Sequence, residues 1–457
     1  MHGDEGAGRT MHEDARNATA FLWHAWFLAL ATTLTDLNTI LPALIVHAGG
    51  TSFEVGILTA IMIGTPILGQ LIFASYLHLK PRKKGFLLLG INLRILALIL
   101  VAVLLWGVEI SSRQAFSGGA TRGLVMLIML IFAIAGTFAG IAYTDLLGRS
   151  LPKARRPMFF VVRQVLTSVG FLISALIARK VLACYTYPWN YVWLFSTASG
   201  LLLVASFGFW ALKEEAVAGS AAQLTFARVL RSLPARFRAD RELRRYIYLV
   251  NLTGFGLTLM PFYVTLVKER HGLTGEQVGT YLLANIVGMI VSNFLWARVV
   301  RRHGFRGVIR GCVICGTLLP VLALVLVHSS TAAYLIVFVL MGAALSARRI
   351  AFPGLLIEIT TAENRALHMG MVGATSFSTA IFPILAGGLI ATVGYAPVFI
   401  LGSLLVAWAF RFTGVHGGGT RRPPPAPRKG RHTLSDAVLL RLGHAGKDRE
   451  DRPLPPP

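Results

Sequence analysis

Twelve long apolar segments, separated by charge, glycine and proline, constrain this chain more than any other feature of its sequence. Each is about as long as the 20 residues that an α-helix needs to cross the hydrocarbon core of a bilayer. Unpaired backbone groups are too costly in lipid, and no segment alternates like a membrane β-strand, so we expect helices. The predicted helices lie at 21–47, 54–79, 86–108, 123–147, 158–178, 190–212, 246–267, 277–299, 307–327, 331–347, 367–391 and 395–412.

The composition agrees with this interpretation and argues against a soluble domain. Of the 457 residues, 55% are apolar and 14% are charged, whereas soluble domains have roughly 45–50% and about 25%. The sequence therefore predicts an all-α polytopic membrane protein with twelve transmembrane helices in two six-helix halves.

The net charge of +24 is interpreted as a topology signal and not as evidence for nucleic-acid binding. Alternate turns between the apolar segments form two sets, of which one carries 24 Lys and Arg residues and the other carries six. The positive-inside rule places the first set, and with it both termini, in the cytoplasm. The N-terminal 20 residues are polar and partly acidic, unlike a secretory signal. We expect an integral protein of the cell (inner) membrane, in contact with lipid.

The apolar segments and the loops between them predict five parts of the chain. A basic loop separates the two groups of six helices, and a Pro-rich tail has too few apolar residues to fold. The parts are a cytoplasmic N-terminal tail (1–20), an N-terminal six-helix bundle (21–212), a basic cytoplasmic linker (213–245), a C-terminal six-helix bundle (246–412) and a disordered basic tail (413–457).

The three cysteines predict neither a disulfide framework nor a metal site. Cys312 and Cys315 form a C-x-x-C pair inside an apolar segment, and Cys184 lies far from both in sequence. A zinc or redox motif needs a second ligand pair or a thioredoxin-like context, which is missing. We expect free thiols, no metal and no cofactor.

One short pattern occurs twice, and its two copies agree with the predicted topology. The pattern G-x-T-x-x-x-V-G begins at Gly49 before the second helix and again at Gly272 before the eighth, 223 residues later. By the same offset, Lys83 corresponds to Arg306 in the following basic turn. Parallel repeats of six-helix halves are typical of transporters whose halves rock around a central site.

Between residues 21 and 412 the chain resembles the major facilitator superfamily. The family motif G-x-L-a-D-r-x-G-r-k falls on residues 75–84, SYLHLKPRKK, and on residues 297–306, ARVVRRHGFR. The first copy lacks both glycines and the acid, and the second has Arg301 at the position of the acid. The first copy matches the motif at Leu77, Lys80, Lys83 and Lys84, and the second at Arg302, Gly304 and Arg306.

The resemblance implies a monomeric secondary transporter without enzymatic activity, which moves a small-molecule substrate by alternating access. In the family, cytoplasmic charges hold the two halves together in one access state, which implies a similar role here for several charged residues. These gating candidates are Lys83, Asp145, Arg156, Arg302, Glu358 and Arg365.

Asp36 is the most informative single residue, because an acid at the centre of a membrane helix costs about 2.5–3.5 kcal/mol. Thr32, Thr33 and Thr39 lie three or four positions away, on the same helical face, and Asn38 adds another polar group. Asp36 is interpreted as a substrate or proton site, titrating near the working pH. The alternative is a buried acid held in a structural ion pair.

Further polar residues line other predicted helices. Arg163 and Gln164 lie in the fifth, near its cytoplasmic edge, where the arginine either snorkels, binds an anionic group or pairs with an acid. The uncharged residues either line a cavity or join helices by hydrogen bonds. The candidates for substrate or proton binding are Asp36, Asn38, Thr32, Gln70, Arg163, Gln164, Asn251 and Asn285.

The sequence thus predicts a secondary active transporter of a small organic solute. No G-x-x-x-x-G-K-[ST] loop is present, so an ion gradient should supply the driving force. Asp36 makes protons the expected coupling ion. One alternative is a transport-fold protein that acts as a sensor or scaffold. The other is a polytopic membrane enzyme, which would need a convergent set of catalytic side chains that the sequence does not offer.

Overall fold

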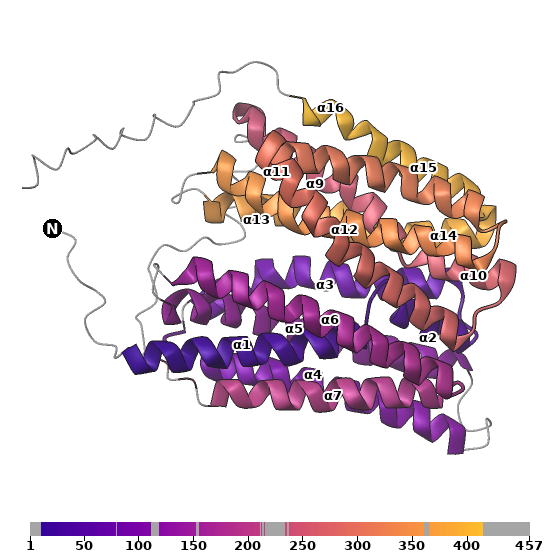
Figure 1. The fold of residues 1–457 in the computed structure, drawn as a ribbon, viewed down its shortest axis with the longest axis horizontal. Coiled ribbons are helices and arrows are strands. Elements are labelled where there is room, and N and C mark those ends of the chain that lie inside the picture. The colour runs from indigo at the N-terminus through magenta and orange to yellow at the C-terminus, as the bar shows by residue number, and fades with distance from the viewer. Residues whose placement is uncertain are drawn as a thin grey trace, which may run out of the picture. The chain divides into compact units, whose positions relative to one another are not determined.

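The computed structural model describes residues 11–78, 80–110, 118–151, 155–210, 212, 214, 234, 237–360 and 365–414. All regular structure among them is α-helical (Figure 1). The N-terminal half contains α1 (Met11–Thr33), α2 (Ile40–His47), α3 (Ser52–His78), α4 (Lys84–Ile110), α5 (Gly118–Ser150), α6 (Arg156–Cys184) and α7 (Trp189–Trp210). The C-terminal half contains α9 (Arg241–Leu259), α10 (Phe262–His271), α11 (Gly275–Leu326), α12 (Thr331–Ile359), α13 (Arg365–Thr375), α14 (Phe377–Val393), α15 (Tyr395–Trp408) and α16 (Phe410–Thr413).

Each of the twelve predicted segments coincides largely with one or two of these helices. Ten helical stretches are long and apolar enough to cross a membrane. One of them, α11, has 52 residues, or about 78 Å of helix, which is more than twice the thickness of the hydrocarbon core. Gly304 has non-helical backbone angles inside α11 and divides it into two spans. The first predicted segment adds the twelfth span, although it is divided between α1 and α2.

Four predicted segments are not continuous helices. The first is interrupted at residues 34–39, the seventh at Met260–Pro261, the eleventh at Ser376, and the twelfth at Ala409. Pro261 has no backbone N–H to donate to the helical ladder, which accounts for the second interruption. Conversely, α12 continues to Ile359, well beyond the predicted end at residue 347.

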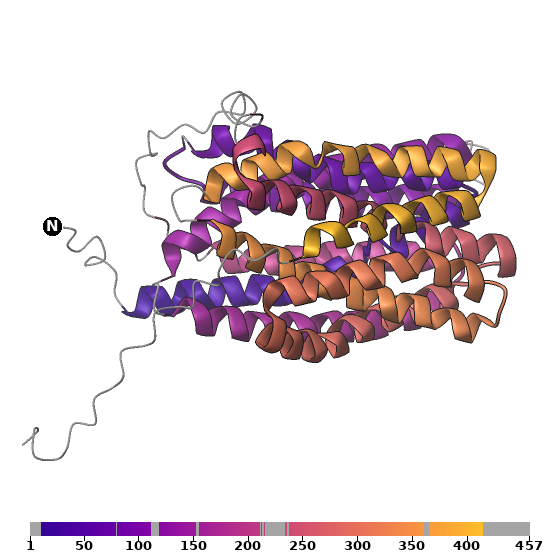
Figure 2. The same cartoon turned by 90° about the horizontal axis from the view of Figure 1, so that it is seen from above.

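The two halves lie side by side, with their helices running roughly along one direction (Figures 1 and 2). Contacts between the halves are made by α3 with α14, α6 with α11, and α2 with α10. The turns between helices gather at two ends. We call the end with residues 48–51 and 272–274 the sealed end, and the end with residues 80–83 and Gly304 the basic end.

Apolar stripes cover the outer faces of the helices. On α6, Val161, Val165, Val169, Ile173 and Leu176 follow one another at intervals of three or four residues and are 39–59% exposed. A soluble protein would bury such a stripe, whereas a bilayer covers it with acyl chains. The chain is therefore an integral membrane protein.

The division into five parts stays a prediction. Most of the predicted linker (213–245), the first ten residues of the N-terminal tail and nearly all of the C-terminal tail (413–457) lie outside the described residues. The described residues of both predicted bundles belong to one compact unit that ends at Thr413.

Candidate functional site

Asp36 lies in the interruption between α1 and α2. Its Oδ1 atom accepts hydrogen bonds from the backbone N–H of Asn38 (2.9 Å) and from the hydroxyl of Thr39 (2.8 Å). Its carbonyl oxygen accepts the backbone N–H of Leu41 at 3.0 Å. Short polar side chains that bond to nearby backbone groups compete with the helical ladder. The side chain of Asp36 therefore both ends one helical segment and supports the start of the next.

A positive charge of the other half of the molecule acts on Asp36. Arg349 of α12 lies within electrostatic range of the Asp36 carboxylate. The Arg349 guanidinium also donates to the sulfur of Met289 in α11, at 3.4 Å. An interrupted helix that presents an acid at the interface between two repeats is typical of ion and substrate sites in transporters.

The sequence did not single out Arg349 as a site residue. The helix predicted at 331–347 ends before it. In the structure both Arg348 and Arg349 lie inside α12. Arg348 donates to the hydroxyl of Thr253 and to the carbonyl of Val250, within the C-terminal half.

The structure brings only part of the predicted polar set to the interruption. Asn38 lies in it, and the Thr32 hydroxyl donates to the carbonyl of Leu28 in the preceding turn (2.8 Å). In contrast, Asn251 bonds within α9 and accepts from Ser378 of α14 (3.1 Å).

The other predicted amides lie apart from Asp36. Asn285 is buried in α11, and its Oδ1 atom has no hydrogen-bond partner among the described residues. The side chain of Gln70 is exposed. Gln164 donates weakly to Ser168 on its own helix, at 3.4 Å. None of these three has a hydrogen bond to Asp36 in the described part of the chain.

A second polar group lies inside the N-terminal half. The Arg163 guanidinium is 5.6 Å from the centre of the Tyr143 ring, which lies 5.9 Å from the ring of His24. Arg94 of α4 lies 4.4 Å from the centre of the Phe132 ring, and both arginines act electrostatically on His24. We call Arg94, Arg163, Tyr143 and His24 the arginine cluster. One arginine changes the mean hydropathy of a long apolar segment very little, so the sequence does not single out Arg94.

Charged residues at the basic end form one network in each half. Lys83 is only 2% exposed and pairs with Asp145 at 2.8 Å, and Arg149 reaches the same carboxylate at 2.7 Å. In the C-terminal half, Glu242 pairs with both Arg306 and Arg245. The equivalence of Lys83 and Arg306 in the repeat thus extends to their pairing with acids.

The remaining gating candidates take other positions. Arg156 donates to the carbonyls of Leu151 and Gly148, at the end of α5. Arg302 and Glu358 are exposed, without an ion pair to any other described residue. The side chain of Arg365 lies outside the described part of the chain.

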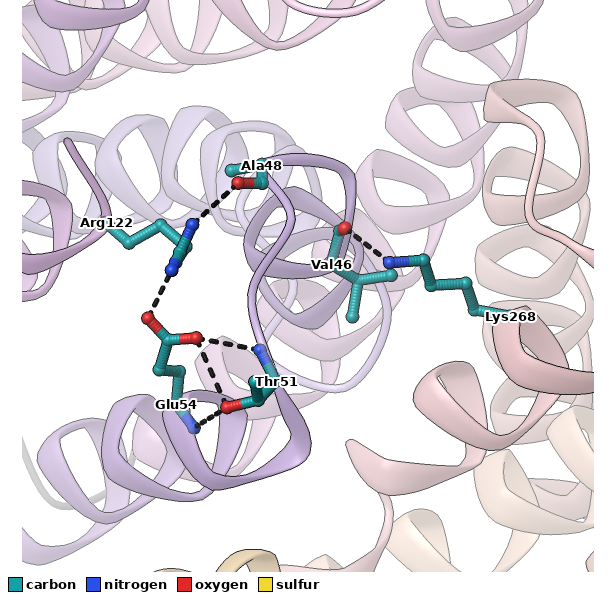
Figure 3. Close-up of polar contacts among 6 residues, drawn as sticks. All are labelled: Val46, Ala48, Thr51, Glu54, Arg122 and Lys268. Atoms are coloured by element: carbon teal, nitrogen blue, oxygen red, sulfur yellow. Dashed lines mark hydrogen bonds and ion pairs between the residues drawn. The ribbon is translucent and has the colours of Figure 1, made fainter. Parts of the chain in front are cut away.

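Hydrogen bonds join the two halves at the sealed end. Lys268 of α10 donates to the carbonyl of Val46 in α2 at 2.9 Å (Figure 3). His47 bonds through Nε2 to the carbonyl of Leu273 at 2.9 Å, while its Nδ1 lies 2.8 Å from the Tyr191 hydroxyl. This arrangement fits a neutral imidazole that donates through one nitrogen and accepts through the other.

The repeated sequence pattern builds this end of the molecule. Gly49 and Gly272 have positive φ angles of 78° and 72°, which favour glycine. In each copy, the threonine two residues later directly precedes the next helix, α3 or α11. In the first copy, Glu54 accepts the backbone N–H of Thr51 (2.7 Å) and pairs with Arg122 (2.6 Å), which also donates to the carbonyl of Ala48 (Figure 3). In the second copy, a capping box starts α11.

The last glycine of each copy faces the opposite half. A Cβ atom on Gly56 would collide with the carbonyl oxygen of Pro383 in α14. A Cβ atom on Gly279 would lie 2.5 Å from the Cα atom of Arg179 in α6. Both copies therefore hold the halves in close contact at the sealed end.

Comparisons with known proteins agree with this architecture. The family model described as Major Facilitator Superfamily matches residues 246–449. No curated protein matches the sequence. Among solved structures, the nucleoside transporter NupG has a TM-score of 0.60 at 13% identity, with 88% of this chain and 98% of that chain covered.

Two further solved structures share the fold. A POT family transporter in complex with 5-aminolevulinic acid has a TM-score of 0.64 at 13% identity, covering 86% of this chain and 94% of that one. A bacterial homologue of the iron transporter ferroportin, in its inward-facing state, has a TM-score of 0.63 at 14% identity, covering 89% and 100%. The family model of the Major Facilitator Superfamily thus matches the second half of the chain, and the fold of these solved transporters is shared over both halves.

Proposed function

We propose that this chain is a secondary transporter of the Major Facilitator Superfamily, that it moves a small organic solute together with protons, and that Asp36 carries the proton. The observation that supports this most is the place of Asp36, in an interruption of the first span and within electrostatic range of Arg349 from the opposite half. Among the acids of the described spans, only Asp36 lies more than two helical turns from an end of its span. Acids at such depth are characteristic of proton relays in transporters.

Access to the site is proposed to come from the basic end, which is the cytoplasmic one. The sealed end is closed by hydrogen bonds of Lys268 and His47 across the two halves. The excess of Lys and Arg in the turns of the basic end supports a cytoplasmic orientation. The solved relatives include transporters whose names refer to nucleosides and to 5-aminolevulinic acid, both small organic molecules.

The experiment measures proton movement that depends on solute. The full chain is reconstituted into liposomes that contain a pH-sensitive dye, and a panel of metabolites is added outside at equal pH. At least one solute should change the internal pH. Asp36→Asn should abolish this solute-driven proton movement, because the amide does not exchange a proton at these pH values, while counterflow of labelled solute persists.

Glu109→Gln is the matched control, since it removes an exposed carboxylate at the end of α4 and should leave proton movement unchanged. Retention of full proton coupling by Asp36→Asn would refute the role of Asp36. Binding of solutes without any flux would instead favour a sensor or scaffold.

A further inference from the structure

Arg94 and Arg163 place two positive charges inside the N-terminal half. Arg94 lies ten residues from the start of α4, and Arg163 lies seven residues from the start of α6. Arg94 therefore lies near the middle of its helix, where a cation costs about 2.5–3.5 kcal/mol and normally has a partner, whereas Arg163 lies about two turns inside α6. The question is which group offsets the two charges.

Neither arginine has an oxygen acceptor among the described residues. The Nε atom of Arg94 is buried and has no hydrogen-bond partner. Its guanidinium contacts only the face of Phe132, and it lies alongside Gly136, whose missing side chain leaves room for it. Arg163 contacts the face of Tyr143. A cation–π contact neutralises no charge and uses none of the five N–H donors of an arginine.

Other members of the cluster also offer donors. The hydroxyl of Tyr143 is buried and has no hydrogen-bond partner in the described part of the chain. His24 is buried beside it, and its Nδ1 atom lies 3.3 Å from the carbonyl of Ala205. The cluster therefore combines two guanidinium groups and a free hydroxyl with no carboxylate.

The charge balance of the membrane interior points the same way. The described interior holds Arg94, Arg163, Arg348 and Arg349 against the single acid Asp36, whose electrostatic partner is Arg349. Arg348 is satisfied by Thr253 and by the carbonyl of Val250. The two arginines of the cluster are thus left with unmatched charge.

We infer that the transported solute carries an oxyanion, either a carboxylate or a phosphate, and that Arg94 and Arg163 bind this group with the hydroxyl of Tyr143. The planar fork of each arginine matches the paired oxygens of a carboxylate or phosphate. This inference rests on the proposed transport function. It adds that a proton on Asp36 offsets one negative charge of the solute during transport.

The test compares anionic solutes with uncharged solutes of related structure. The panel pairs lactate with lactamide, benzoate with benzamide, and glycerol 3-phosphate with glycerol, in the same liposome assay. Anionic members should drive proton movement and their uncharged counterparts should not. The carboxylate and phosphate pairs distinguish the two kinds of oxyanion.

Variants then locate the binding group. Arg94→Gln and Arg163→Gln should each raise the half-saturating concentration of the active anion about tenfold or more, because a charge-assisted hydrogen bond is lost. Arg298→Gln removes an exposed arginine of α11 near the basic end and should have no effect. Arg94→Lys keeps the charge without the fork and should lie between wild type and Arg94→Gln, which separates binding from folding.

Uncharged solutes that drive proton movement as well as anions would overturn the inference and leave the proposed function standing. So would Arg94→Gln and Arg163→Gln proteins that fold and keep the wild-type affinity for the anion. A lack of flux with every solute, charged or not, would refute transport itself, and the inference with it.

Discussion

The two carboxylate oxygens of Asp36 have different surroundings. Oδ1 accepts from the Asn38 backbone and from Thr39, and these bonds hold the backbone of the interruption. An asparagine oxygen can accept the same two bonds. The structural and the proton-carrying roles of this residue are therefore separable by a single substitution.

Arg349 should set the pH range of coupling. A nearby positive charge favours the ionised form of a carboxyl group. Arg349→Gln removes that charge, so the pH profile of solute-driven proton flux should differ from that of the wild type. Arg349→Lys keeps the charge and should keep the wild-type profile. The check is the flux profile in liposomes from pH 5 to 9, and identical profiles for Arg349→Gln and wild type would contradict the pairing with Asp36.

At the scale of elements, glycine decides how closely helices of the two halves approach. The contact of α3 with α14 depends on Gly56, and that of α11 with α6 depends on Gly279. Backbone atoms lie where a side chain would be, so a larger residue cannot be accommodated by a change of rotamer. The second glycine of the repeated pattern is thus explained by the neighbouring half and not by its own helix.

Gly56→Ala should therefore destabilise the protein. The new methyl group has to displace α14, and overpacking of this kind costs about 1–3 kcal/mol. Gly107→Ala is the matched control, because a Cβ atom at Gly107 in α4 meets no atom within 4 Å. There alanine should be neutral or stabilising, by up to about 1 kcal/mol. Thermal unfolding in detergent measures both, and equal midpoints for the two variants would contradict a tight contact at Gly56.

For the whole molecule, the orientation in the membrane follows from native cysteines. Cys184 is exposed and ends α6 at the sealed end, whereas Cys312 and Cys315 are buried in α11. If the basic end is cytoplasmic, a membrane-impermeant maleimide should label Cys184 in intact cells. Labelling should disappear in Cys184→Ser.

A cysteine introduced by Arg302→Cys in the Cys184→Ser protein provides the opposite control, because residue 302 lies at the basic end. It should react only after the cells are permeabilised. Labelling of this cysteine in intact cells would reverse the proposed orientation.

Hydropathy and charge predicted the twelve spans because burial in lipid depends on composition averaged over about 20 residues. Such an average does not predict the interruption at 34–39, because this interruption depends on individual hydrogen bonds of Asp36 and Thr39. Arg349 lies outside the helix predicted at 331–347, whereas α12 continues to Ile359.

The candidate site was predicted only in part for a related reason. Asp36 was identifiable from its sequence because a single acid in an apolar segment is conspicuous. The proximity of Arg349 to Asp36 and the arginine cluster both depend on which helices are neighbours in space. A single sequence does not specify these neighbours. The repeated glycine pattern predicted two related halves. The contact of Gly56 with the opposite half depends on the packing of α3 against α14, which the pattern does not predict.

The interruption of the first span has a mechanical consequence. It divides that span into α1, which contacts α6 and α7 of its own half, and α2, which is bonded to the other half through Lys268 of α10 and through the contact of His47 with Leu273. If the halves separate at the sealed end, residues 34–39 are therefore the part of the first span that lies outside both helices and can bend. The residue proposed to carry the proton lies in this same stretch, so a change in its charge and a bend of the span would act on the same hydrogen bonds.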